Sequence, residues 1–460
     1  MADNMEMTKK NGITEGVIWK QLLIFFFPIL IGSFFQQLYS TIDTIIVGQY
    51  VGKEALAGVG STGTISWLLV GFFIGLASGA SVIISQFFGA RDAESLSKSV
   101  HTSLALAIVG GVILTVVGLA TARPSLGWIN VPAEVMDEAY TYITVYYAGV
   151  LASIIYNVGT GILRAIGDSR MPLYVLIVCC VVNVLLDLLF VVAFRWAVFG
   201  VALATVISQA VSAVLIMIRL MRTREAYRVE LKKIRFDGPM LKQVVRIGLP
   251  MGAQSVLYSV SNLVIQVAVN NFDSTNVVAA WTAVGRVDGF VWMVMGAFGI
   301  AVTTFVGQNF GAGKYDRVKR GTAVCLGMTL ISVGVLTALE IIFAGPILRV
   351  FTGDEAVVEL GTSFVKIWAP AYLIYVFVEI YSGAIRGVGE AMQPTIIIVF
   401  GICALRFVWI WGVLPFYNVP GMVAASYPVT WGITGAIFII YYLRMNWLRR
   451  HVPAEMRQYI

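Results

Sequence analysis

The chain has 460 residues, of which 58% are hydrophobic and only 12% are charged, and its formal net charge is +7. Because an average soluble domain contains about 25% charged residues, this composition excludes a soluble globular protein. The basic excess lies mainly in the loops between apolar stretches, where membrane topology accounts for it, and we expect no nucleic-acid partner.

About twelve apolar stretches recur along the chain, each about 20 residues or longer, the length that a helix needs to cross a hydrocarbon core of about 30 Å. The predicted spans of the first half are 20–43, 55–79, 97–120, 138–161, 170–193 and 198–219. Those of the second half are 241–266, 277–304, 318–341, 360–384, 393–416 and 420–443. The sequence therefore predicts an all-α membrane protein.

Basic residues predict the orientation, because Lys and Arg in short loops stay on the cytoplasmic side. With the N-terminus inside, 25 of the 32 Lys and Arg residues lie in cytoplasmic segments, five lie on the opposite side, and two, Arg286 and Arg406, lie within spans. Both termini are therefore predicted to be cytoplasmic. The first span is too long for a signal-peptide core and no small-residue cleavage site follows it, so we expect it to be retained.

Several motifs recur at one constant offset in the sequence. Pro28 recurs as Pro250, residues 86–90 recur as residues 308–312, and residues 163–168 recur as residues 385–390. Such repetition indicates an internal duplication. Because each half holds an even number of spans, the halves enter the membrane in the same sense, with a cleft between them. We predict lobes at 1–219 and 241–460, joined by a cytoplasmic linker at 220–240.

Glycines and cysteines in the spans have structural interpretations. Gly71, Gly75 and Gly79 share one helix face, which lets a neighbouring backbone approach closely. Four further glycines are predicted to end helices, with a proline early in the helices that follow two of them: Gly89, Gly167, Gly311 and Gly389, with Pro172 and Pro394. The four cysteines fall inside apolar spans without metal-type spacing, so we expect core residues and no disulfides: Cys179, Cys180, Cys325 and Cys403.

Polar side chains gather in the spans of the first half. An ionisable group in hydrocarbon is costly, so each one is a functional hypothesis. The spacing places polar faces on four spans: Gln36, Tyr39 and Asp43; Asn157; Asn183 and Asp187; Thr205 and Gln209. Two carboxylates with amide and hydroxyl oxygens suit a proton or a small cation. The alternative is that both carboxylates lie near the membrane interfaces and are solvated.

The second half carries a different ionisable set. At the offset of the repeat, the positions equivalent to Asp43, Asn183 and Asp187 hold apolar or aromatic residues, namely Ile265, Leu405 and Trp409. Arg286 and Asp288 are two residues apart and should point to different sides of their helix. Arg406 has two candidate partners, Glu379 and Asp288, in a pair that would lock helices together.

Two polar stripes in the second half suggest substrate contacts. Tyr372, Tyr375 and Glu379 share one face of the tenth span, and Tyr258 and Asn262 share one face of the seventh. Aromatic rings beside a carboxylate attract organic cations. The alternative is packing or interfacial anchoring of the tyrosines.

Over nearly its whole length the chain resembles the multidrug and toxic compound extrusion (MATE) family. The most specific pieces are Ile42-Asp43-Thr44 followed by Gly48, the repeated Gln-x-Phe-Gly-Ala motif, and Asn183 with Asp187 and Thr205. The resemblance implies two six-helix bundles around a V-shaped cleft. It also implies efflux of drugs or metabolites, driven by inward movement of protons or sodium ions and achieved by rocking between two states.

The resemblance also implies site residues. The cation-coupling positions match Asp43, Asn183, Asp187, Thr205 and Asn157, where H⁺ or Na⁺ would bind and no other cofactor or metal is expected. The expected substrates are small cationic or amphiphilic organic compounds. They would bind a cleft lined by Gln36, Tyr39, Tyr258, Asn262, Asp288, Tyr375 and Glu379. We expect a monomer in a bacterial cytoplasmic membrane.

Other functions receive less support from the residues. A flippase for a lipid-linked sugar would be expected to line its cleft with several cations, and only Arg286 and Arg406 lie in spans. A narrow-specificity metabolite exporter stays open. An enzyme is not expected, because His101 and His451 both lie at span ends, where neither forms an intramembrane Ser/His pair. No nucleotide-binding Gly-Lys-Ser/Thr loop is present, which excludes ATP as the energy source on this chain.

Overall fold

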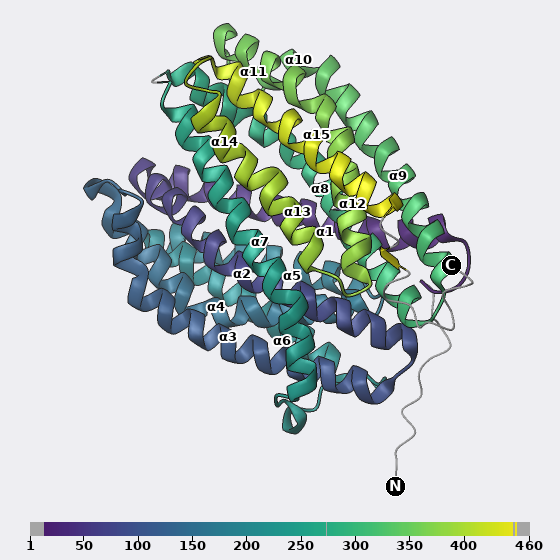
Figure 1. Ribbon diagram of the computed structural model, residues 1–460. Helices are drawn as coiled ribbons and strands as arrows, with labels where there is room; N and C mark the ends of the chain where they lie inside the picture. The colour runs from purple at the N-terminus through teal and green to yellow at the C-terminus, as the bar shows by residue number, and fades with distance from the viewer. Residues whose placement is uncertain (1–12, 273, 445–446, 449–460) are drawn as a thin grey trace. The chain divides into compact units, whose positions relative to one another are not determined.

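The computed structural model describes residues 13–272, 274–444 and 447–448. These residues form helices and short turns, without a strand among them (Figure 1). Twelve segments of the described chain are long and apolar enough to cross a membrane. The predicted fold class and the number of spans are therefore confirmed. The termini to which the orientation prediction refers, residues 1–12 and 449–460, lie outside the described residues.

The helices follow one another with short connections. The first seven are α1 (Ile18–Ile46), α2 (Lys53–Ala90), α3 (Ala93–Trp128), α4 (Met136–Ala165), α5 (Arg170–Asp187), α6 (Ala197–Arg222) and α7 (Gly238–Asn270). The others are α8 (Thr275–Gly311), α9 (Tyr315–Ile342), α10 (Ala344–Arg349), α11 (Glu355–Trp368), α12 (Tyr372–Gly387), α13 (Met392–Ile398), α14 (Leu405–Gly412) and α15 (Pro420–Arg444). Three π-helical segments interrupt or extend them: η1 (Val47–Val51), η3 (Leu188–Ala193) and η6 (Val399–Ala404).

The chain divides into two compact units. The N-terminal unit comprises Ile24–Val256 with the described residues before Glu15, and the C-terminal unit comprises Glu15–Leu23 and the described residues from Leu257 onward. The predicted lobe limits at 219 and 241 stay a prediction. Each unit is described below by itself.

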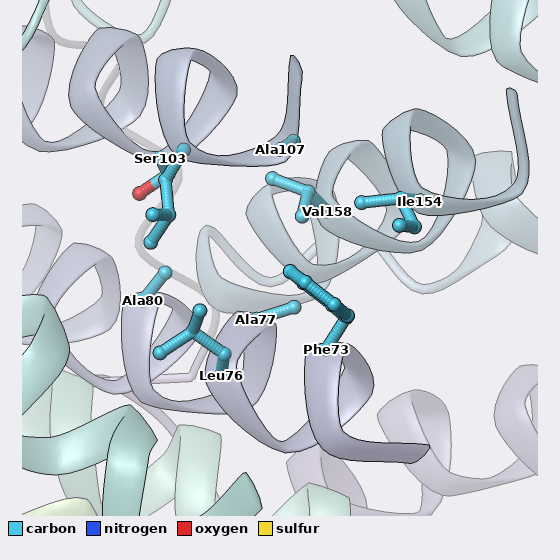
Figure 2. Close-up of a pocket in the computed structure, with 9 residues that line it drawn as sticks. Phe73, Leu76, Ala77, Ala80, Ser103, Ala107, Ile154 and Val158 are labelled. Atoms are coloured by element: carbon cyan, nitrogen blue, oxygen red, sulfur yellow. The ribbon is translucent and has the colours of Figure 1, made fainter. Parts of the chain in front are cut away.

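The core of the N-terminal unit is centred on α4, which packs against α2, α3 and α6. Leu96 and Val100 of α3, Ile154 and Ile162 of α4, and Ile216 of α6 are almost fully buried there. Figure 2 shows a void within this core, bordered by side chains of α2, α3 and α4. Its volume of about 10 Å³ leaves space for about one water molecule, so it is too small for an organic substrate.

Glycines bring α2 and α7 together inside the N-terminal unit. A Cβ atom built on Gly75 would overlap the backbone of Gly252, and one built on Gly79 would overlap the backbone of Gly248. A Cβ atom on Gly71 would meet only Ser255 Cβ, at 3.9 Å. The predicted close backbone approach is therefore found at Gly75 and Gly79.

The predicted helix ends recur in both halves. Gly167 follows α4 with φ +92° and Gly389 follows α12 with φ +94°, a left-handed conformation that glycine adopts without strain. Gly89 lies in the last turn of α2, where Arg91 takes the left-handed conformation, and Gly311 is the last residue of α8. Pro172 and Pro394 each stand third in the helix they begin, α5 and α13.

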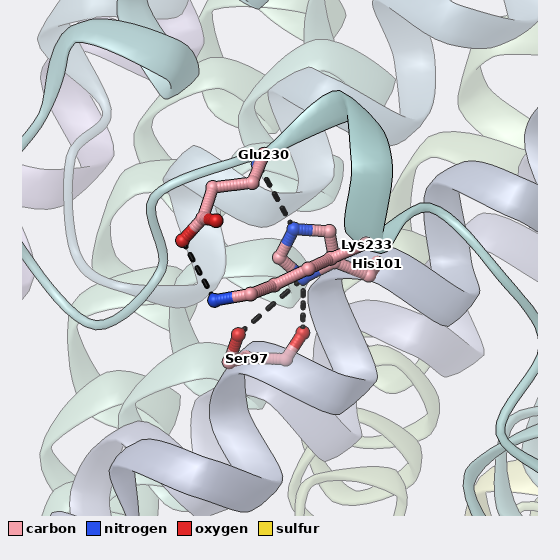
Figure 3. Close-up of polar contacts among 4 residues, drawn as sticks. All are labelled: Ser97, His101, Glu230 and Lys233. Carbon is pink, nitrogen blue, oxygen red and sulfur yellow. Dashed lines mark hydrogen bonds and ion pairs between the residues drawn. The ribbon is translucent and has the colours of Figure 1, made fainter. Parts of the chain in front are cut away.

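The basic segment between α6 and α7 is held on α3 (Figure 3). His101 Nε2 accepts a hydrogen bond from the Glu230 backbone N–H at 3.0 Å, and His101 Nδ1 lies 2.7 Å from the Ser97 carbonyl oxygen. The tautomer with its proton on Nδ1 satisfies both contacts. The Lys233 ammonium donates to the Glu230 carboxylate at 2.7 Å, and this contact lowers the pKa of Glu230.

The glycine contact between α2 and α7 predicts that a glycine-to-alanine substitution lowers stability at one position of α2 and not at another. Gly79→Ala should lower the free energy of unfolding by about 1–3 kcal/mol, because the added Cβ overlaps the Gly248 backbone. Gly71→Ala is the matched control, since its Cβ makes only an ordinary van der Waals contact. Thermal unfolding of the purified variants in one detergent measures both, and equal midpoints would contradict the close packing.

The His101 contact predicts how readily the segment 223–237 opens. In His101→Ala the Glu230 N–H loses its hydrogen-bond acceptor. Because such a hydrogen bond contributes about 1 kcal/mol, local opening of the segment should become about fivefold more frequent. Limited trypsin digestion reads this directly, because the segment is rich in Lys and Arg. Ser97→Ala serves as control because it keeps the backbone carbonyl that His101 contacts. Equal cleavage rates in the wild type and His101→Ala would rule out an anchoring role.

Candidate functional site

Two carboxylates and one amide meet in the N-terminal unit. Asp43 lies in the last turn of α1, and Asn183 and Asp187 lie one turn apart on the same face of α5. With its nitrogen turned toward the carboxylates, the Asn183 amide donates to Asp43 Oδ1 at 2.8 Å and to Asp187 Oδ2 at 3.2 Å. The opposite orientation would set the amide oxygen against carboxylate oxygens, so the hydrogen-bond pattern assigns this one. Asn183 thus bridges the two carboxyl groups.

The carboxyl groups of Asp43 and Asp187 also lie within hydrogen-bonding reach of each other. Asn183 and Asp187 are fully buried. Asp187 Oδ1 has no hydrogen-bond partner within the described part of the chain. Two adjacent carboxylates in a low-dielectric interior cannot both stay negatively charged without a proton or a cation beside them. The chemistry of this cluster therefore suits H⁺ or a small monovalent cation.

Hydroxyl groups surround the carboxylates. Thr205 of α6 donates to the Val201 carbonyl at 3.0 Å, and the hydroxyls of Tyr39 and Tyr142 lie beside the Thr205 hydroxyl. Within the described residues the Tyr39 hydroxyl has no hydrogen-bond partner. Tyr142 was not among the predicted site residues. Its four-residue spacing from Tyr146 could have indicated it, because residues four apart share one face of a helix. The rings of Tyr142 and Tyr146 stack with their centroids 6.3 Å apart. These hydroxyls supply further oxygen atoms next to the carboxylates.

Two other predicted residues of the first half have no hydrogen bond to this cluster among the described residues. The Asn157 amide nitrogen donates to the Ser153 carbonyl one turn earlier on α4, at 2.8 Å. No hydrogen bond among the described residues joins Asn157 to either carboxylate. Gln36 is exposed on α1. Their roles in coupling and in substrate contact stay predictions.

π-helical segments follow both carboxylates. η1 begins four residues after Asp43, and η3 begins directly after Asp187. π-turns are rare and occur frequently at functional sites. Side chains from and around these two segments form a buried apolar cluster: Ile46, Val47, Ala55, Val191, Val198 and Val201. Part of this cluster, Ile46, Val47 and Val191, follows the two carboxylates of α1 and α5 by one turn.

In the C-terminal unit, Arg406 is fully buried among aromatic side chains. Its Nη1 donates to Asn262 Oδ1 at 2.8 Å, and its guanidinium carbon stands 4.3 Å from the Tyr427 ring centroid and 5.5 Å from that of Tyr258. The Tyr375 and Tyr258 hydroxyls lie side by side. Arg406 forms no ion pair with Glu379 or Asp288, because an amide and two rings occupy its surroundings.

Three carboxylates of the C-terminal unit, those of Asp288, Glu340 and Glu379, lie in two places. Trp368 Nε1 donates to Asp288 Oδ1 at 3.3 Å, and the Glu340 carboxyl lies within hydrogen-bonding reach of Asp288. Glu379 packs against Gly299 of α8, with Arg386 as the nearby cation. Glu340 is only 3% exposed and was missed by the sequence analysis. Its signal was an acid isolated between Leu and Ile in the last turn of a predicted span.

Arg286 faces a cavity of about 850 Å³ in the C-terminal unit. Its lining is largely apolar, and the polar residues on the α7 and α8 side are Asn270, Ser274, Thr275, Thr282 and Arg286. Arg286 and Asp288 point to different sides, as their spacing predicts. The predicted cleft residues do not line this cavity, and their assignment to a substrate cleft stays a prediction.

The described residues hold no group of three or more His, Cys, Asp or Glu side chains that could bind a metal ion. All four cysteines are free and buried, as expected for core residues. A bound Na⁺ at Asp43 and Asp187 would therefore rest on two carboxylates with amide, hydroxyl or water oxygens.

Comparison with known proteins gives the family. The MatE family model matches residues 28–189 and 250–411. The second match begins at Pro250 and the first at Pro28, the pair of prolines that the repeat relates, and the two matches end at equivalent positions, 189 and 411. The double match thus has the offset of the predicted duplication.

Relatives and solved structures match most of the chain. It is 30% identical over 392 residues to Probable multidrug resistance protein YoeA of Bacillus subtilis, covering 84% of each chain. It is 24% identical over 400 residues to the FAD transporter of Shewanella oneidensis, covering 85% of this chain and 87% of the relative. A structure of a multidrug resistance MATE family transporter in the outward-facing conformation matches with TM-score 0.88 and 22% identity. It covers 96% of this chain and 99% of that one.

The duplicated all-helical fold and its twelve apolar spans define a multi-pass membrane transporter. The chain belongs to the MATE family, whose members are transporters and not enzymes. It is accordingly a lipid-embedded protein.

The amide bridge at Asn183 predicts a specific loss. Asn183→Ala removes the donor shared by the buried carboxyl group of Asp187 and the half-buried one of Asp43, so the free energy of unfolding should fall by about 1–3 kcal/mol. Thr44→Ala is the control, because the Thr44 hydroxyl is exposed and donates only to its own helix. Thermal unfolding in a fixed detergent and buffer compares them, and an unchanged midpoint for Asn183→Ala would contradict the bridge.

Proposed function

We propose that the chain is a cation-coupled antiporter, driven by H⁺ or Na⁺, that exports small cationic or amphiphilic organic compounds by alternating access. The carrying observation is the cluster of Asp43, Asn183 and Asp187, two neighbouring carboxyl groups in an apolar interior that share one amide donor. Such a group binds and releases one cation or proton, which is what ion coupling requires. No cofactor besides the coupling ion is proposed.

The names of relatives support organic substrates. Relatives are named as multidrug resistance or multidrug export proteins. They favour export of organic compounds over flipping of a lipid-linked sugar. A narrow-specificity metabolite exporter is the second candidate, because one relative is named as an FAD transporter.

The mechanism follows from differential binding. With the site empty, Asp43 and Asp187 repel each other, and Asn183 partly offsets this by donating to both. A bound cation or proton removes the repulsion and favours the packing in which α1 and α5 lie close together. Binding of the ion lowers the affinity for substrate only if each ligand binds the two conformations with different affinity. A tenfold preference for one conformation corresponds to about 1.4 kcal/mol.

The location is proposed on the same basis as the orientation. The region from the end of α6 to the first turns of α7 contributes most to the predicted cytoplasmic charge, with nine Lys and Arg residues from 219 to 246. This bias supports a bacterial cytoplasmic membrane with both termini on the inner side. We propose a monomer as the transporting form.

Transport in proteoliposomes tests the coupling site. Efflux of ethidium is measured under separately imposed proton and sodium gradients for the wild type, Asp43→Asn and Asp187→Asn. One gradient should drive efflux by the wild type, and both variants should lose at least nine-tenths of the driven rate, because an amide cannot take up the proton or neutralise the cation. Asp92→Asn is the matched control, an exposed α3 N-cap where Asn also caps well.

Retained gradient-driven efflux in both variants would overturn the assignment and move attention to Asp288 and Glu340. Efflux that neither gradient accelerates would overturn the antiport mechanism itself.

A further inference from the structure

Arg406 is a buried cation without a counter-charge in the described structure. It is 0% exposed, and the ion pairs found among the described residues do not include it. Nη1 donates to Asn262, whereas Nε and Nη2 have no hydrogen-bond partner in the described chain. A guanidinium carries five N–H donors and cannot lose its charge in a protein. The cost of burying this group is therefore left largely uncompensated.

The neighbouring rings attract the charge, and the Tyr258 hydroxyl lies within hydrogen-bonding reach of the guanidinium, but Nε and Nη2 stay without a partner in the described chain. Tyr427 and Tyr258 face the guanidinium at 4.3 and 5.5 Å, distances typical of cation–π contacts. A ring face accepts a hydrogen bond only weakly. Nε and Nη2 share one edge of the guanidinium, and that edge is the fork that binds the two oxygens of a carboxylate or phosphate. The two free donors are thus a matched pair.

In the internal repeat, this arginine stands at a position equivalent to the carboxylate cluster of the other half. At the offset that relates Pro250 to Pro28, Asn262 corresponds to Ser40, Arg406 to Val184 and Tyr427 to Thr205. The three equivalent segments, on α1, α5 and α6, are those that bring Asp43, Asn183 and Thr205 together in the N-terminal unit. The same place in each unit therefore holds a polar cluster, with carboxylates in one and a guanidinium in the other.

Two further features single out this place in the C-terminal unit. The π-helical segment η6 ends two residues before Arg406, as π-helical segments also adjoin the carboxylates of the N-terminal unit. Aromatic rings continue from the guanidinium: Tyr427 lies 5.1 Å from Trp431, and Trp431 lies 5.1 Å from Tyr375. These rings pack against one another and form a largely buried aromatic wall that begins at the guanidinium.

We propose that Arg406, with Asn262, Tyr258 and Tyr427, forms an anion-binding site in the C-terminal unit that takes the carboxylate or phosphate of an aromatic compound. The inference rests on the proposed export function, which it narrows toward substrates that carry an aromatic acid group. The purely structural alternative is that Arg406 only ties α7, α14 and α15 together.

Binding to the purified full-length protein separates these roles. Isothermal titration in one buffer uses benzoate and phenyl phosphate as anionic probes, benzamide as the uncharged analogue of benzoate, and sodium chloride as the inorganic anion. At least one anionic aromatic probe should bind at least tenfold more tightly than benzamide. Binding of chloride with no response to either aromatic anion would overturn the proposal, as would no binding by any probe.

Variants assign the binding to this arginine. Arg406→Met should weaken the aromatic anion at least tenfold, and a purely structural role would instead lower thermal stability without changing affinity. Arg406→Lys keeps the positive charge but loses the paired N–H donors of the guanidinium, so it should bind the aromatic anion with intermediate affinity. If the methionine variant does not fold, the lysine variant is measured in its place. Arg286→Met is the matched control, an arginine in a span of the same unit that lines a cavity to which Arg406 does not contribute. Equal affinity in the wild type and the Arg406 variants would overturn the proposal.

The same titration separates this inference from the coupling mechanism. Asp43→Asn should abolish gradient-driven efflux of ethidium and leave the affinity for the aromatic anion within twofold of the wild type. Loss of efflux with intact, Arg406-dependent anion binding supports both ideas. Intact efflux in Asp43→Asn with Arg406-dependent binding overturns only the coupling site.

Discussion

The structure depends on one constraint, that hydrocarbon solvates neither backbone polar groups nor charges. Every backbone N–H and C=O in the membrane must be paired internally, which leaves helices as the spanning elements of this chain. The same constraint makes each in-span charge costly, so the few that are present need a proton, an ion, an amide or a ring beside them. Asp43 and Asp187 share the Asn183 amide, and Arg406 has Asn262 and two tyrosine rings. The polar sites of the protein are the places where this requirement is only partly met.

The internal duplication explains why these two polar sites stand at equivalent positions of the two halves. Both halves carry the same helical frame, as the repeated motifs and the double family match show. The frame brings equivalent points of three helices together in each unit, whatever side chains stand there. One copy retained oxygen ligands at this meeting point, and the other acquired a guanidinium and aromatic rings. A duplicated fold can thus hold two sites of opposite charge without any change in its architecture.

The features that could be predicted from the sequence are those that depend on a single helix. Apolar length predicted the spans, four-residue spacing predicted that Asn183 and Asp187 share a face, and small residues at Gly75 and Gly79 predicted close packing. Contacts between helices depend on how each helix is rotated about its axis, and one sequence does not state this. The partner of Arg406 was therefore wrongly sought among acids, and Glu340 and Tyr142 were missed. The π-turns also escaped prediction, because they shift the helical face by one residue without a proline or a charge to mark them.

The sign of the two sites limits what the transporter can carry. A cation that binds at Asp43 and Asp187 acts on the N-terminal unit alone, yet linkage couples it to any substrate that prefers one conformation, wherever that substrate binds. A purely cationic substrate gains nothing from Arg406 and must bind away from it, beside Asp288 or Glu379 or on aromatic surface. A substrate with both an aromatic ring and an acid group gains from the rings and from the free fork of Arg406 together. On the proposed assignment, the charge distribution in the C-terminal unit selects among organic compounds, and the carboxylates of the N-terminal unit set the driving ion.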